Sequence, residues 1–159
     1  MPATARRRPD LYRSLKVFVI ICVLLMLAAC AATSSYEQGQ RYHEAGEYGQ
    51  AIAAYSQAID NPSSDRELFR AVYQRAKVYQ ELDQLEEAFR DFYAAKLVSC
   101  YLEEQEKPVG GYASGMIPST YCREWADRNL ASVSAGIGPD RQKQLKSQAE
   151  ALVPGYVME

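Results

Sequence analysis

One stretch of this chain is repeated 37 residues further on, as from Ala51 to Ala88, and this repetition constrains the fold more than any other feature. When residues 36–62 are written above residues 73–99 without gaps, small and aromatic residues fall at the same places in both copies. Self-similarity at a period of this length indicates a repeat architecture, in which each copy is one supersecondary unit. The matched pairs are Gly39 with Ala76, Tyr42 with Tyr79, Tyr48 with Leu85, Ala51 with Ala88, Tyr55 with Phe92, and Ala58 with Ala95.

The matched residues resemble the tetratricopeptide repeat. In that family a small residue and an aromatic residue on the first helix interlock with alanine, an aromatic residue and alanine on the second. This sequence departs from the family in two ways: neither copy has the early tryptophan, and Asp83 replaces Gly46 at the turn. The resemblance covers residues 34 to about 102. It implies an all-α fold of two tetratricopeptide-like helical hairpins in an α-α superhelix.

Local signals for helix starts and ends agree with two hairpins. Ser34 and Ser64 are each followed three residues later by glutamate, which is the capping-box pattern, and Asp83 is a good N-cap residue. Gly46 can end the first helix in a left-handed conformation. We therefore expect helices at about 35–45, 48–60, 65–82 and 84–105, within a repeat region at 35–106.

A Gly-rich loop at 107–118 separates the repeats from a further helical region. Residues 119–134 carry a mostly apolar stripe at helical spacing, and we expect Trp125 of this stripe to lie in the core. Gly138-Pro139-Asp140 then opens a last helix. Because repeat arrays need terminal caps, we interpret these segments as a C-terminal capping helix pair at 119–153, followed by a tail at 154–159.

The N-terminal segment has the composition of an export signal. Five basic residues up to Lys16 precede thirteen apolar residues at 17–29. That run is too short for a spanning helix, which needs about 20 residues, and it suits a signal core. The sequence Leu27-Ala28-Ala29-Cys30 resembles the lipobox of bacterial lipoproteins, in which the cysteine is acylated. The resemblance implies a cleaved signal peptide at 1–29, lipidation of Cys30 and a tether at 30–34.

One alternative and one refinement apply to this N-terminal segment. An ordinary secretory signal with an A-x-A-like cut and a chance cysteine would have a similar composition. If the lipobox is genuine, the small uncharged Ala31 after the modified cysteine resembles lipoproteins sorted to the outer membrane of a two-membrane bacterium. We therefore expect attachment to the membrane through lipid, on a protein that faces the periplasm.

The mature chain would be acidic, with 18 − 5 = 13 basic and 20 − 1 = 19 acidic residues. Basic clustering, the footprint of nucleic-acid binding, is absent from this sequence, so no nucleic-acid partner is expected. Cys100 and Cys122 would remain in an oxidising compartment, where we favour a disulfide between them. Two buried free thiols, or one thiol pairing between molecules, are the alternatives. Two cysteines and one distant histidine do not make a set of four metal ligands.

The sequence offers few parts for catalysis. His43 is the one histidine, and the chain has neither a Gly-rich phosphate loop nor a nucleophile elbow. Carboxylate pairs such as Glu86-Glu87 are typical of solvated helix faces. We therefore expect neither an enzyme nor a cofactor or metal site.

The family resemblance implies a peptide-binding groove. In tetratricopeptide proteins the first helix of each repeat lines a concave groove, and partner peptides contact fixed offsets on it. Carried over to this chain, those offsets predict a partner-binding groove formed by Tyr36, Gln40, His43, Glu44, Arg70, Tyr73, Lys77, Gln80 and Glu81. The alternative for Tyr36 and Tyr73 is that they pack against the next helix instead.

These features together favour a lipid-anchored periplasmic module for protein–protein interaction. It would act as a scaffold or adaptor in envelope assembly, secretion or pilus machinery, with an envelope protein as partner and a place in a larger complex. One alternative is a binder of a small molecule or cell-wall fragment that uses Trp125 and Tyr112. The other is an enzyme whose glutamate or aspartate residues act as acid and base.

Overall fold

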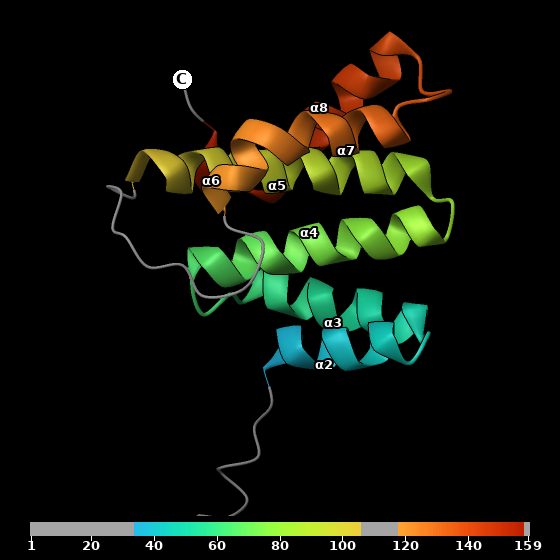
Figure 1. Cartoon of the computed structure of the whole chain (residues 1–159), viewed down its shortest axis with the longest axis vertical. Helices are drawn as coiled ribbons and strands as arrows, with labels where there is room; N and C mark the ends of the chain where they lie inside the picture. Colours follow the sequence, from blue (N-terminus) through green and yellow to red (C-terminus); the bar gives the residue numbers. More distant parts are fainter. Residues whose placement is uncertain (1–33, 106–117, 158–159) are drawn as a thin grey trace, which may run out of the picture. The chain divides into compact units, whose positions relative to one another are not determined.

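The computed structural model describes residues 34–105 and 118–157, and these residues form helices and short connections without any strand (Figure 1). The all-α fold class is therefore confirmed. The predicted signal peptide at 1–29, the lipidation site Cys30 and the tether up to residue 33 lie outside the described residues. So do residue 106, residues 107–117 of the predicted Gly-rich loop with Tyr112, and the end of the predicted tail. The elements in chain order are α2 (Ser35–Glu44), α3 (Tyr48–Asp60), α4 (Asp65–Glu81), α5 (Leu85–Gln105), α6 (Pro118–Thr120), η1 (Tyr121–Trp125), α7 (Ala126–Val133), α8 (Pro139–Leu152) and η2 (Pro154–Tyr156).

Helices α2 to α5 form two consecutive helical hairpins that stack on each other (Figure 1). Each helix packs against the next one along the chain, and α2 also contacts α4. The start and end of each helix lie within one residue of the bounds expected from the sequence. Ser34 and Ser64 cap α2 and α4 as expected, because their hydroxyl oxygens accept hydrogen bonds of 3.2 Å from the amides of Glu37 and Glu67.

The two hairpin turns have the same backbone geometry. Gly46 and Asp83 follow the ends of α2 and α4 with φ angles of +74° and +58°. In both turns the next amide bonds back to a carbonyl in the helix, Glu47 to Tyr42 at 2.8 Å and Gln84 to Tyr79 at 2.9 Å. This is the Schellman arrangement, which satisfies carbonyls at a helix end.

The expectation that Asp83 is an N-cap residue is wrong. Asp83 terminates α4 in the left-handed region, and α5 begins two residues later at Leu85. Aspartate is one of the few residues besides glycine that adopts this conformation at modest cost, because its short side chain can bond locally. Aspartate suits both helix starts and left-handed turns, and in this chain Asp83 occupies the turn.

The matched positions of the two copies are buried alike. Ala51 and Ala88 have no exposed surface, and Tyr55 and Phe92 are at most 1% exposed. In the first hairpin Gly39 leaves room for the tyrosine, since a Cβ atom there would lie 2.5 Å from ring carbons of Tyr55. The repeated small and aromatic residues thus let the helices of each hairpin approach closely.

A buried ion pair crosses the second hairpin. Arg75 of α4 binds Asp91 of α5 through two nitrogens, at 2.6 and 3.2 Å, and Asp91 has no exposed surface. The same guanidinium donates to the hydroxyl of Ser56 on α3 at 2.8 Å, and Arg90 bonds Asp91 at 2.8 Å. Three helices are therefore joined by one network of charge-assisted hydrogen bonds, the strong kind in protein interiors.

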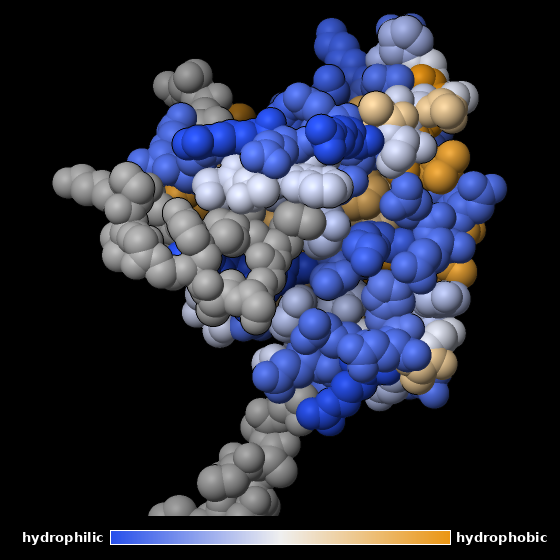
Figure 2. Space-filling model, in the orientation of Figure 1, coloured by the Kyte–Doolittle hydropathy of each residue, from blue (hydrophilic) through white to orange (hydrophobic). Residues whose placement is uncertain are grey.

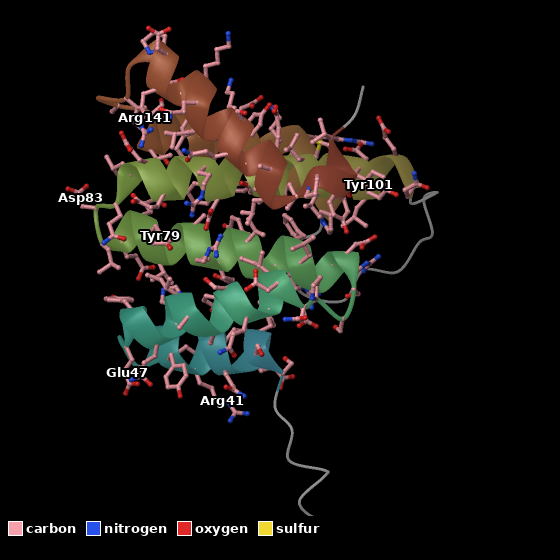
Figure 3. The ribbon with its side chains drawn as sticks, turned by 180° about the vertical axis from the view of Figure 1, so that it is seen from behind. Arg41, Glu47, Tyr79, Asp83, Tyr101 and Arg141 are labelled. Atoms are coloured by element: carbon pink, nitrogen blue, oxygen red, sulfur yellow. A yellow bond between two sulfur atoms is a disulfide. The ribbon has the colours of Figure 1, made fainter. Side chains whose placement is uncertain are left out.

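The C-terminal elements all use α5 as their support. Helices α6, η1, α7 and α8 each pack against α5, and Figures 1 and 3 show the C-terminal helices on the side of α5 opposite α4. A disulfide joins Cys100 of α5 to Cys122 of η1, with a Cα–Cα distance of 5.1 Å. At the chain end the hydroxyl of Tyr156 donates to Asp65 at 2.6 Å, and burial together with this contact raises the pKa of Tyr156 to about 12.

A π-helical turn explains why Trp125 is not in the core. Trp125 is 40% exposed, whereas Tyr121 and Ala126 are fully buried. In an α-helix residues 121 and 125 would share a face. Here the amide of Ala126 bonds to the carbonyl of Tyr121, a spacing of five residues, which brings Ala126 beneath Tyr121 instead. The expectation of a core tryptophan is therefore wrong.

Within the described ranges, none of the helices has both the length and the apolar character needed to cross a membrane.

Removing one partner of the buried ion pair should destabilise the protein far more than removing both. Asp91→Ala leaves the guanidinium of Arg75 buried and uncompensated, and we expect a loss of about 3–5 kcal/mol in the free energy of unfolding. The double variant Asp91→Ala with Arg75→Met should recover most of that loss. Urea unfolding of the three proteins measures both effects. Equal stability of the single and double variants would contradict the role given to the pair.

Candidate functional site

The surface where α2 and α4 lie side by side contains most of the predicted groove residues, and we call it the α2–α4 face. It consists of Gln40, His43 and Glu44 on α2 and of Lys77, Gln80 and Glu81 on α4. The imidazole Nε2 of His43 lies 3.0 Å from the carboxylate of Glu81, so the two helices are joined directly at this face. The two stacked hairpins thus bring together residues that are almost 40 positions apart in sequence.

Each residue on α2 has a counterpart on α4 at the same offset as the core pairs. Gln40 corresponds to Lys77, His43 to Gln80, and Glu44 to Glu81. Gln40, His43 and Lys77 are half-buried and the others are exposed. Five of the six matched positions keep a small or an aromatic residue in both copies, while two of the three pairs on this face change chemistry. This contrast is typical of a surface whose side chains do not determine packing.

The third helix at this face is α7, which the repeat pattern did not predict. The amide of Gln80 donates to the hydroxyl of Ser132 on α7 at 3.1 Å. Lys96 of α5 binds Asp127 of the same helix at 2.7 Å, which holds α7 against the second hairpin. Ser132 carried no sequence signal for this position, because the chain after residue 118 does not continue the repeat.

Tyr36 and Tyr73 pack into the structure rather than standing on the face. The ring centroid of Tyr36 lies 6.0 Å from that of Tyr55. Tyr73 packs among the rings of Phe69, Phe92 and Tyr121, and its ring centroid lies 5.2 Å from that of Tyr121. Burial raises the pKa of both hydroxyls above the usual 10.0. Tyr36 and Tyr73 therefore pack against neighbouring helices, which was the alternative expectation for them.

Arg70 lies apart from the α2–α4 face at the other end of α4. It is exposed, and its positive charge partly offsets the effect of burial on the pKa of Tyr36. Figure 2 shows that hydrophilic residues predominate on the visible side of the molecule, with apolar residues scattered among them. The α2–α4 face itself consists of polar and charged side chains, so its recognition would depend on charge and hydrogen bonds more than on an apolar patch.

The remaining exposed ion pairs attach the C-terminal helices to α5. Arg141 of α8 donates to Glu86 at 3.0 Å, and this hydrogen bond lowers the pKa of the Glu86 carboxyl. Arg123 of η1 pairs with Glu103. Beside it Trp125 is exposed, with the guanidinium of Arg128 lying 5.5 Å from its ring centroid.

Metal coordination has no obvious place on the surfaces described. Within residues 34–105 and 118–157, no three His, Cys, Asp or Glu side chains are grouped closely enough to hold an ion. His43, the one histidine of the sequence, is engaged with Glu81 and lies with its ring edge toward Tyr48.

Comparison with protein-family models, curated proteins and solved structures found no match to this chain. What the protein does must therefore be argued from the geometry of its own residues.

Buried phenols should make the protein lose stability in alkali. Burial raises the pKa of Tyr55 and Tyr121 above 10.0, so the unfolded chain ionises these groups at a lower pH than the folded protein does. Their contribution is complete below pH 10.0 and is lost as the pH rises from there toward the folded-state pKa. Each phenol should lower the free energy of unfolding by about 1.4 kcal/mol per pH unit in that range.

Urea unfolding at several values between about pH 9 and 11 measures this slope. The variant Tyr121→Phe should show a smaller slope than the wild type, because it has one buried phenol fewer. Identical pH profiles for the two proteins would contradict the prediction.

Proposed function

We propose that this chain is a lipid-anchored module for protein–protein interaction in the bacterial cell envelope. It is a small scaffold or adaptor built on two tetratricopeptide-like hairpins, facing the periplasm from the outer membrane. Its partner is an envelope protein of an assembly, secretion or pilus system. The observation that carries the proposal is the α2–α4 face, where two equivalent helices present polar side chains, two of the three pairs differing in chemistry, over small and aromatic residues that are buried alike in both hairpins.

The geometry of the hairpins favours binding over catalysis. Two helices held side by side offer a row of amide, amine and carboxylate groups. These groups can form hydrogen bonds and ion pairs with the side chains of an extended partner segment. Pre-organisation of this kind lowers the entropic cost of association. The buried network of Arg75 and the disulfide from Cys100 to Cys122 stabilise the helices that carry the row.

The lipid anchor would set where this surface works. Several acyl chains on Cys30 hold a protein at a membrane stably, since each buried methylene contributes about 0.8 kcal/mol. A short tether at 30–34 would keep the helical unit close to the lipid surface. A small binding module then gains from a high local concentration of membrane partners, as linked binding sites do.

Crosslinked capture from native membranes tests the binding proposal. The test variant combines Gln40→Ala with Lys77→Glu, which changes two half-buried side chains of the α2–α4 face. The matched control combines Gln57→Ala with Lys143→Glu, which makes the same chemical changes at exposed positions of α3 and α8. We expect one protein to be captured by the wild type and by the control, and its yield to fall at least about tenfold for the test variant, the equivalent of 1.4 kcal/mol.

Circular dichroism of the test variant must first show unchanged helix content and thermal unfolding. Capture that survives in the folded test variant would contradict binding at this face. Capture lost equally in the control would place the interface elsewhere on the surface.

The proposed anchor predicts a different outcome for each N-terminal cysteine. Cys30→Ser should abolish labelling by a palmitate analogue and release the processed protein from membranes, because the thiol that accepts lipid is gone. Cys22→Ser is the control, since Cys22 belongs to the proposed signal core and should leave labelling unchanged. An unaltered membrane fraction for Cys30→Ser would contradict the lipoprotein proposal.

A further inference from the structure

Two contacts place α4 beside the segment formed by η1 and α7. The ring centroids of Tyr73 and Tyr121 lie 5.2 Å apart, and further along both helices the amide of Gln80 donates to the hydroxyl of Ser132 at 3.1 Å. The earlier residue of one helix meets the earlier residue of the other, and the later residue meets the later one. The two helices therefore run in the same direction, as Figure 1 also shows.

Helical spacing puts a lysine and an arginine at the same level of these parallel helices. Lys77 is three residues before Gln80, and Arg128 is four residues before Ser132, which is about one turn in each case. Trp125 is seven residues before Ser132, about two turns back on the same side of the helix. We call the surface formed by these five residues the α4–α7 surface.

Both cations of the α4–α7 surface lack a carboxylate partner. Lys77 is half-buried and Arg128 is exposed, and neither forms an ion pair within residues 34–105 and 118–157. Glu124 lies four residues before Arg128, a spacing at which helical ion pairs can form, but it makes none with Arg128. The positive charge of this surface is therefore available to a ligand.

Other acids on the neighbouring helices are already paired with different cations. The carboxylate of Glu81 lies 3.0 Å from the imidazole of His43, and Asp127 binds Lys96 at 2.7 Å. Both acids thus have partners that lie on other helices than the α4 lysine and the α7 arginine. On a mature chain that would be acidic, with 13 basic and 19 acidic residues by the count above, two adjacent cations without counterions are unusual.

The one tryptophan of the sequence is exposed beside the arginine of this surface. Trp125 is 40% exposed, and the guanidinium carbon of Arg128 lies 5.5 Å from its ring centroid. The π-helical turn produces this exposure, because it brings Ala126 beneath Tyr121 in place of the indole. Such turns are frequent at functional sites, and tryptophan and arginine are enriched among the residues that dominate binding energy at interfaces.

We propose that the α4–α7 surface binds an acidic segment of the partner protein, with a carboxylate between Lys77 and Arg128 and an apolar side chain packed on Trp125. This inference rests on the proposed function, since it names the chemistry of the partner at a surface that shares Lys77 and Gln80 with the α2–α4 face. The argument is charge complementarity. A carboxylate has two oxygens and accepts from an ammonium and a guanidinium at once, in charge-assisted hydrogen bonds.

An extended peptide suits the spacing of this surface. Side chains two residues apart in an extended segment lie on the same side and about 7 Å apart. The level of the two cations and the level of Trp125 are separated by about one helical turn, or ~5 Å. A glutamate and an apolar residue two positions later can therefore meet both levels. A free inorganic anion would use the cations and leave the indole without a partner.

Fluorescence of the full chain tests the surface, because Trp125 is the only tryptophan and its emission reports on this place alone. The probes are pentapeptides blocked at both ends, Ser-Glu-Ser-Leu-Ser and the same peptide with glutamine in place of glutamate. At concentrations up to ~10 mM, typical of a weak short-peptide contact, the glutamate peptide should shift the emission saturably to shorter wavelength, because it removes water from the indole. The glutamine peptide should not. Equal shifts for both peptides, or none, would overturn the proposal.

Variants assign the two cations. Lys77→Ala and Arg128→Ala should each weaken binding of the glutamate peptide about tenfold, because each removes a charge-assisted hydrogen bond, while circular dichroism shows unchanged helix content. The matched controls are Lys143→Ala on α8 and Arg41→Ala on α2, both exposed, and Arg41 points away from the second hairpin in Figure 3. The controls should bind as the wild type does. An equal loss in the controls would overturn the site, by showing attraction to the overall charge.

A third peptide isolates the role of the indole. Ser-Glu-Ser-Gly-Ser keeps the carboxylate and lacks the apolar side chain, so it should bind at least about threefold more weakly than the leucine peptide. Equal affinity for the two peptides would remove Trp125 from the site and overturn the proposal.

Other anions are tested against the same surface. Displacement of the glutamate peptide by an equal concentration of sodium phosphate would overturn the proposal, by showing a site for inorganic anions. Vesicles of phosphatidylglycerol, compared with vesicles of phosphatidylcholine, test an anionic lipid surface. Binding to the anionic vesicles that is lost in both Lys77→Ala and Arg128→Ala would overturn the choice of a protein segment.

The outcomes keep this inference apart from the proposed function. If a partner is captured at the α2–α4 face but the glutamate peptide does not bind, only the acidic-segment site is wrong. If the peptide binds as expected and no envelope protein is captured, the site is supported and the adaptor role is contradicted.

Discussion

The structure depends most on one buried contact, the ion pair of Arg75 with Asp91. Two charges inside a protein are tolerated only when they are paired and fully hydrogen-bonded, and here Ser56 and Arg90 complete the set. Because the guanidinium reaches α3, α4 and α5 at once, it fixes the register of the second hairpin on the first. That register is what places α4 beside α2. The equivalent residues of the first hairpin are Gln38 and Ala54, so this constraint belongs to the second copy alone.

Helix α5 transmits the same constraint to the C-terminal region. One side of it holds the ion pair with α4, and the rest of its surface receives α6, η1, α7 and α8. The disulfide at Cys100 and the ring contact of Tyr73 with Tyr121 hold the non-repeating segment in place. As a result α7 lies near α4, where Ser132 bonds to Gln80 and extends the α2–α4 face. The packing of small and aromatic residues in the interior thus positions α2, α4 and α7 so that they share one polar surface.

The helices of the two hairpins could be predicted because their determinants are local and repeated. Small residues such as Ala51 and Ala88, with the cap residues Ser34 and Ser64, lie at fixed spacings that the sequence displays directly. The ion pair could not be predicted in this way, because an arginine and an aspartate on helices usually belong to solvated faces.

The position of Trp125 could not be predicted for a related reason. A helical period of 3.6 puts Trp125 on the same face as Tyr121, but one π-helical turn changes the face of every later residue. The fate of Tyr36 and Tyr73 was open for a third reason. For Tyr73 it depends on Tyr121, which lies outside the repeated segment, and for Tyr36 on its ring contact with Tyr55 of the next helix. The residues of the α2–α4 face could be predicted from the offsets that the tetratricopeptide resemblance implies. The contact of Ser132 on α7 with Gln80 could not.

Amide hydrogen exchange on the captured complex would test the central claim most directly, that the α2–α4 face is the surface that meets the partner. Backbone amides are read along the whole chain, with and without the partner. The account predicts slowed exchange at residues 40–44 and 77–81, while the exposed side of α8 stays as in the free protein. Protection confined to α8, or to the region around Trp125, would contradict it.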